Sequence, residues 1–271
     1  MISDVVALIT ELITAAPVAG CDETTLRCGP RGEKKYILSA STERYVALPL
    51  GRRTLDSFAE FGILPRFAGI VVSDRYPHYF HPRWKYLGGH QACLAHLLRD
   101  FPDAAEHYPG AIWPEQAQRA LCGLVHAWHD ARDNALPEIP LQARQDLLIE
   151  FRAAIAVGLS QVPRNPGPAN QTKQPVGRDL LEFCRDHHSS VTGFCFDTRI
   201  WPTNNISERD LRPTKTQQKI SGRLSCEVVT QHRLDIRSYL DTARKHGENV
   251  MTVLRSVMIG TPWSPPIPEP G

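Results

Sequence analysis

Three acidic residues, Asp22, Asp74 and Glu208, have the side-chain type and the local context needed to bind metal ions. Asp22 follows the apolar run 16–21, which predicts a strand that ends at this aspartate. Asp74 follows the apolar run 69–73 in the same way. Glu208 follows a polar segment typical of a helix start, so we expect it in a first helical turn. Two divalent ions about 3.5–4 Å apart need carboxylate oxygens from converging rigid elements, and such a pair supports phosphodiester chemistry.

Each of these carboxylates also has a second interpretation. Alternation along a strand places Asp22 and Thr24 on one face and Glu23 on the other, and the residues alone leave open which acid is the metal ligand. Asp74 could simply cap the turn that follows its strand. An acid in the first turn of a helix, as predicted for Glu208, is common because it interacts favourably with the helix dipole.

Basic residues follow Glu208, although the whole chain is nearly neutral, with a formal net charge of +2. Residues 209–223 contain five cations and one acid, Asp210. Such a strip fits contact with phosphates, and the alternative is a solvated helix face. Pro213 predicts that the helix kinks or ends near Arg212. The candidate DNA-binding residues are Arg209, Arg212, Lys215, Lys219 and Arg223.

Five stretches of the chain resemble, in the correct order, segments of one protein family. They are Asp22-Glu23-Thr24 with Arg27, residues 62–67 leading to Ser73-Asp74, and residues 93–99, 204–222 and 236–245. Over about residues 12–260 the chain resembles the catalytic part of bacterial transposases of the insertion-sequence-66 family. Each motif alone is weakly specific, and their shared order makes the resemblance strong.

The resemblance implies an α/β fold, with an RNase H-like catalytic core interrupted by a helical insertion. It implies a DDE-type DNA transposase that cleaves DNA at element ends and transfers the strands. Asp22, Asp74 and Glu208 would be its catalytic residues and would hold two Mg²⁺ or Mn²⁺ ions. The implied partners are DNA, further copies of the chain in the DNA complex, and accessory proteins of the same element. His96 and Arg99 become possible accessory residues, although both could simply begin an inserted helix.

The chain also departs from the family pattern. Full-length members carry a coiled-coil segment, a zinc-binding segment and a helix-turn-helix-like region upstream, whereas here Asp22 lies almost at the N-terminus. The Arg-Lys-Asn segment common after the glutamate helix is replaced by Gln217-Gln218-Lys219. Two alternatives therefore stay open: a truncated, non-catalytic remnant that binds DNA or a full-length partner, and an RNase H-like nuclease that cleaves without joining.

Apolar periodicity predicts the elements that must position these residues. We expect a helix over 2–15, strands near 17–22, 35–41 and 44–49, a helix over 53–61 and a strand over 69–73, then a helix near 177–188 and a strand near 192–196. The predicted division is 1–88 for the N-terminal helix and first part of the core, 89–176 for the helical insertion and linker, 177–260 for the second part of the core, and 261–271 for a proline-rich tail.

Cysteine usage and the N-terminus bear on the cellular compartment. Seven cysteines are scattered without a Cys-x-x-Cys pair, which is typical of reduced thiols. Cys93-x-x-His96 is half of a zinc pattern without a second half, and a buried helix face explains it better. The N-terminal apolar stretch contains Asp4 and Glu11 and has no basic start, unlike a signal peptide. No run reaches the roughly 18 apolar residues of a membrane span, so we expect a cytoplasmic protein.

Overall fold

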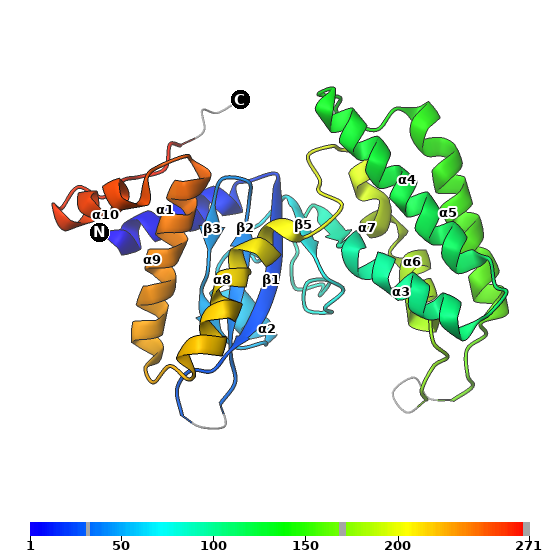
Figure 1. Cartoon of the computed structure of the whole chain (residues 1–271), viewed down its shortest axis with the longest axis horizontal. Helices are drawn as coiled ribbons and strands as arrows, with labels where there is room; N and C mark the ends of the chain where they lie inside the picture. Colours follow the sequence, from blue (N-terminus) through cyan, green and yellow to red (C-terminus); the bar gives the residue numbers. More distant parts are fainter. Residues whose placement is uncertain (31–32, 168–171, 268–271) are drawn as a thin grey trace. The chain divides into compact units, whose positions relative to one another are not determined.

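The computed structural model describes residues 1–30, 33–167 and 172–267. The chain forms two compact units, one of Met1–Gly89 with Asn204–Gly271 and one of His90–Thr203. The first contains a sheet with helices, and the second is helical (Figure 1). This division groups residues 177–203 with the helical unit, whereas the sequence analysis placed them in the core. Parts of the predicted linker and proline-rich tail, 168–171 and 268–271, lie outside the described residues.

The sheet of the first unit is built around β1 (Val18–Leu26), which pairs antiparallel with β2 (Lys35–Ser41) and parallel with β5 (Ile70–Ser73). The short strands β3 (Val46–Ala47) and β4 (Leu50–Gly51) pair antiparallel with β2. The strand order is therefore β3-β2-β1-β5. The predictions for 35–41 and 69–73 are confirmed, while the run 44–49 forms only β3 and leads into β4. The strand predicted to end at Asp22 continues to Leu26 because its pairing with β2 extends that far, so Asp22 lies within β1.

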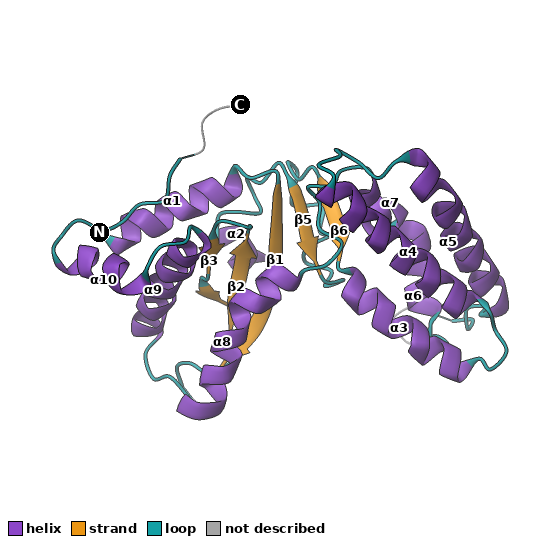
Figure 2. Ribbon diagram, turned by 45° about the horizontal axis from the view of Figure 1, so that its top comes forward, coloured by secondary structure: helices purple, strands orange, loops and turns teal. Residues whose placement is uncertain are grey.

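Helices cover both faces of this sheet (Figure 2). Ile9 and Ile13 of α1 belong to one apolar cluster with Cys21 of β1. Leu26 of β1 belongs to a second cluster with Leu211 of α8. Cys21 and Leu26 are five positions apart, so they point to opposite faces of the strand. The helices of this unit are α1 (Ile2–Thr14), α2 (Leu55–Glu60), α8 (Asn205–Ser221), α9 (Glu227–Lys245) and α10 (Val250–Met258).

The second unit is a bundle in which α4 and α5 pack closely on each other. The strand predicted near 192–196 is wrong, because this stretch forms a short helix and a 3₁₀ turn. Val191, Phe194 and Cys195 are fully buried there, which is helical spacing and not the alternation of a strand. The elements are α3 (Leu94–His107), α4 (Trp113–Asp133), α5 (Leu141–Gln161), α6 (Arg178–Asp186), α7 (His188–Thr192) and η1 (Gly193–Cys195), and β6 (Gly89–Ala92) begins at the division.

The described part of the chain contains no helix with the combined length and apolarity that crossing a lipid bilayer requires.

Candidate active site

The parallel pairing of β1 with β5 brings Asp22 and Asp74 to neighbouring positions. Val18 pairs with Ile70, an offset of 52 (70 − 18), and the next two residues of each strand follow in step. The same offset separates Asp22 from Asp74 (74 − 22 = 52). The pairing is formed as far as Gly20 and Val72, and extending its register by two residues would set the aspartates side by side, about 4.8 Å apart. The charge of Asp74 raises the pKa of Asp22, which agrees with this proximity.

Gly69 permits this register because the two backbones approach closely where the pair begins. The Ile70 N–H donates to the Pro17 carbonyl oxygen at 2.9 Å. A Cβ added at Gly69 would lie 2.4 Å from the same oxygen. Any side chain at this position would push the strands apart, so the alignment of the two aspartates depends on a glycine.

Asp22 is a half-buried carboxyl with an unusual proton affinity. Burial raises its pKa from 3.8 to about 7; the Lys215 charge lowers the pKa, and the charges of Glu23 and Asp74 raise it. The backbone N–H of Glu23 donates to Asp22 Oδ1 at 2.9 Å, which favours the ionised form. The ionised carboxylate is thus incompletely compensated by the protein, and a bound cation would stabilise it.

Asp74 begins the loop after β5 and also caps the turn there. Its Oδ1 accepts the N–H of Tyr76 at 2.9 Å, and its backbone oxygen accepts Ser73 Oγ at 2.9 Å. Asp74 therefore caps the turn through its Oδ1 atom, as one of the two interpretations of the sequence predicted. Among the described residues, Oδ2 of Asp74 and Oδ2 of Asp22 make no hydrogen bond, which leaves one oxygen of each for a ligand.

Contacts at both ends hold α8 against β1. At its start, Nδ2 of the N-cap residue Asn204 donates to the Cys21 carbonyl oxygen at 2.7 Å. Farther along, the side-chain amide of Gln218 donates to the Thr25 carbonyl oxygen. The helix therefore advances 14 residues (218 − 204) while β1 advances four (25 − 21).

Glu208 lies in the first turn of α8, as predicted, and is half-buried. Interpolation between the two contacts puts the level of Asp22 at about residue 207 or 208 of the helix. Asp22 shares its strand face with Leu26, which packs against Leu211 of α8. Glu208 is therefore expected near the level of Asp22 on the same side of the sheet, although the carboxylate oxygens of Asp22, Asp74 and Glu208 do not all lie within 4.8 Å of one another.

Glu23 points to the opposite face and already has partners. Its carboxylate accepts Tyr79 Oη at 2.6 Å and lies 2.6 Å from Nη2 of Arg53, and its side chain is only 4% exposed. A buried carboxylate with these two partners is compensated without a metal ion. This geometry favours Asp22 over Glu23 as the ligand.

Arg53 connects Glu23 to the loop that carries Asp74. Its guanidinium lies 3.7 Å from the ring centroid of Tyr76, the residue whose N–H binds Asp74. Tyr79, on the same loop, donates the hydrogen bond from its hydroxyl to the Glu23 carboxylate. The sequence does not predict the contacts of Arg53 and Tyr79 with Glu23, because they join residues far apart in the chain and form only in the fold.

The helix that carries Glu208 does not end at Pro213, so the predicted helix end near Arg212 is wrong, while the kink stays a prediction. α8 continues to Ser221, and Arg237 of α9 supports the interrupted turn. Arg237 donates to the Asp210 carbonyl oxygen at 3.2 Å and to Thr214 Oγ1 at 3.2 Å, on either side of the proline. These contacts hold the turn that contains Pro213 against α9, although the carbonyl oxygen that loses its helical N–H partner is that of Arg209 (213 − 4).

All five cations of the predicted basic strip are exposed, but they have different surroundings. Lys215, Lys219 and Arg223 line a groove beside β1, whereas Arg209 and Arg212 lie nearer the start of α8 and outside the groove lining. The DNA-binding role of all five stays a prediction.

His96 and Arg99 lie on α3 of the second unit. His96 is half-buried, and the exposed Arg99 donates from Nε to the Ala95 carbonyl oxygen at 3.2 Å. The buried Cys93 is the N-cap of the same helix. This placement agrees with the interpretation of the segment as a helix start, and the accessory role of His96 and Arg99 stays a prediction.

Comparison with known proteins identifies the family. No curated protein matches the chain. The family model described as "Transposase IS66 family" matches residues 1–228, which include β1, β5 and the whole of α8. Because this match covers most of the 271 residues, the chain belongs to the IS66 family of transposases.

Proposed function

We propose that this chain is the catalytic domain of a DNA transposase that uses divalent metal ions to cleave DNA at element ends and to join the strands. Family membership supports a transposase function. The observation that carries the finer proposal is the register that sets Asp22 beside Asp74, next to the helix that bears Glu208. The order β3-β2-β1-β5, with only β5 parallel to β1, supports an RNase H-like core.

The chemistry of these residues fits divalent ions. Carboxylate oxygens are the ligands that Mg²⁺ and Mn²⁺ prefer, and Asp22 and Asp74 each have an oxygen available. Burial and neighbouring acids raise the pKa of Asp22, so a cation would relieve an existing electrostatic cost. We assign Asp22, Asp74 and Glu208 as the groups that hold two ions. Bound in pairs, such ions activate a water or 3′-hydroxyl and stabilise the leaving oxygen.

The surrounding residues position the DNA. The Lys215 charge lowers the pKa of Asp22, so this cation is near enough to the carboxylates to contact a phosphate bound there. Arg209 and Arg212, exposed on α8, would hold neighbouring phosphates. Phosphate contacts of this kind fix the position of DNA without reading its sequence. A second copy of the chain would bind the other element end.

Nicking and joining assays test this proposal. The chain should nick supercoiled plasmid in Mg²⁺ or Mn²⁺ and join a labelled 3′-hydroxyl oligonucleotide to target DNA. Asp22→Asn, Asp74→Asn and Glu208→Gln should each abolish both products. Glu248→Gln, at an exposed acid between α9 and α10, should retain both. Nicking without joined products would identify a nuclease, and binding without either product would identify a non-catalytic remnant.

A further inference from the structure

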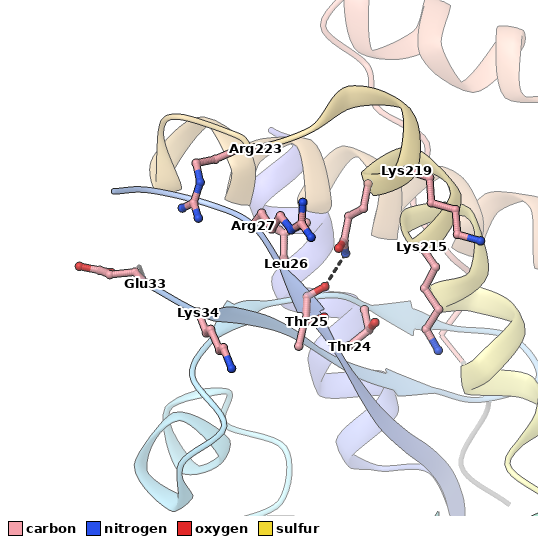
Figure 3. Close-up of a pocket in the computed structure, with 10 residues that line it drawn as sticks. Thr24, Thr25, Leu26, Arg27, Glu33, Lys34, Lys215, Lys219 and Arg223 are labelled. Carbon is pink, nitrogen blue, oxygen red and sulfur yellow. Dashed lines mark hydrogen bonds between the residues drawn. The ribbon is translucent and has the colours of Figure 1, made fainter. Parts of the chain in front are cut away.

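A groove of about 660 Å³ lies between the end of β1 and the C-terminal half of α8 (Figure 3). Its cationic side chains come from both walls. Arg27 follows β1 and Lys34 precedes β2, whereas Lys215, Lys219 and Arg223 come from α8 and the residues after it. Nothing along the chain shows that Arg27 and Lys34 face the basic strip, so their place in the groove emerges only from the fold.

The groove carries a strong and uncompensated positive charge. Five cations line it against one acid, Glu33, which gives a net charge of +4 (5 − 1). Glu33 lies 3.8 Å from Lys35, and Lys35 in turn pairs with Glu227 at 2.9 Å. Within the described residues, none of the five groove cations forms an ion pair with a carboxylate. Clustered cations without acidic partners attract a polyanion.

Hydrogen bonds fix the two walls of the groove relative to each other. The side chain of Gln218 bonds the backbone of Thr25, as the dashed line in Figure 3 shows. At the far end, Nη1 of Arg223 donates to the carbonyl oxygens of Gly29 at 3.0 Å and Pro30 at 2.6 Å. The cations are therefore carried by a preformed backbone frame, so binding a ligand does not require the walls to assemble.

The groove leads to the candidate active site. Thr24, on its lining, shares a strand face with Asp22, two residues away. Lys215, also on the lining, is close enough to Asp22 to lower its pKa. From Asp22 to Arg27 the chain advances five residues, about 16 Å at the rise of a strand. At the charge spacing of about 3.4 Å per strand, this length accommodates at most about five phosphates.

We infer that the groove binds the phosphates of one DNA strand, the one that carries the reacting phosphodiester. The groove, of about 660 Å³, runs beside one strand of the sheet over a length of about five phosphates, which matches contact with a single sugar–phosphate backbone. No aromatic side chain is present among the described lining residues, so the groove contacts phosphates and does not stack bases. The inference rests on the proposed function for the active site, whereas the binding itself requires no metal ion.

Fluorescence anisotropy with a labelled 12-nucleotide single strand, in EDTA and over a salt series, tests this inference. The groove variant combines Arg27→Gln, Lys34→Gln and Lys219→Gln. Losing three phosphate contacts should reduce the salt slope by about 2 and lower the affinity about 100-fold at 0.1 M salt. The melting temperature checks folding, and Arg27→Lys, which keeps the charge, should retain the affinity.

A charge-matched control separates groove binding from general surface attraction. Arg44→Gln, Lys85→Gln and Arg233→Gln together remove three exposed cations of the same unit outside the groove lining. This variant should bind the single strand within about threefold of wild type. An equal loss in both triple variants, or a groove variant that loses only duplex binding, would overturn the inference. If the groove variant loses single-strand binding but the wild type does not nick DNA, the proposed function fails and the groove inference stands. If the wild type nicks DNA but the groove variant binds the single strand as well as the wild type does, the groove inference fails and the proposed function stands.

Discussion

Replacing Asp22 with asparagine should stabilise the metal-free protein at pH 8 and have a much smaller effect at pH 5. Burial is the main cause that raises the pKa of Asp22 from 3.8 to about 7. A group whose pKa is higher in the folded state stabilises the fold fully below its unfolded pKa. That stability is lost as the pH rises through the folded value. The window for this residue is therefore about pH 4 to 7.

The magnitude follows from the size of the pKa change. A difference of 3.2 units (7 − 3.8) corresponds to a total of about 4 kcal/mol, at about 1.36 kcal/mol per unit. Of this free-energy change, only the part that develops between pH 5 and the folded pKa of about 7, about two pH units, falls within the measured range of pH 5 to 8. The Asp22→Asn variant should thus gain about 3 kcal/mol relative to wild type between pH 5 and pH 8.

Urea unfolding of both proteins in EDTA at pH 5, 6, 7 and 8 measures this difference. Asparagine has no titrating group, so subtraction removes the pH dependence of all other residues. Glu248→Gln, at an exposed acid, serves as the control for loss of one carboxyl. Adding Mg²⁺ at pH 8 should reduce the advantage of the variant, because the ion stabilises only the ionised aspartate. A stability difference that is constant from pH 5 to pH 8 would refute the assignment of Asp22 as an incompletely compensated carboxyl.

Three further outcomes are expected. Millimolar Mg²⁺ or Mn²⁺ should raise the melting temperature of the wild type, and Asp74→Asn should blunt the rise because one ligand is lost. Arg53→Ala should lower the unfolding free energy by about 2 kcal/mol, measured in urea, because Glu23 is only 4% exposed and loses its cation, while the 39% exposure of Arg53 limits the effect. Lys245→Met should cost about 3 kcal/mol in the same assay, because it leaves the largely buried Asp210 without its partner at 2.7 Å.

Local patterns predicted several elements of the first unit. The run 35–41 forms β2 with the predicted bounds, and the helical spacing of residues 2–15 forms α1. Tertiary contacts explain the failures: Arg237 supports α8 through Pro213, and the apolar run 192–196 is buried as a helical turn. Such contacts join residues far apart in the sequence, and no local pattern encodes them.

The candidate site shows the same limit. The prediction of a strand end is right for Asp74, which follows β5, and wrong for Asp22, because β1 continues to Leu26. Their shared register depends on the close approach at Gly69, which only the folded sheet reveals. The face of Glu23 follows from alternation, whereas its pairing with Arg53 does not.

The central claim is that Asp22, Asp74 and Glu208 together hold divalent ions. Anomalous diffraction at the manganese edge from crystals soaked in Mn²⁺ tests it most directly. The expected result is anomalous density bounded by these three carboxylates, which disappears in crystals of Asp74→Asn. Manganese bound only elsewhere on the protein, with these carboxylates free of it at saturating concentration, would contradict the account.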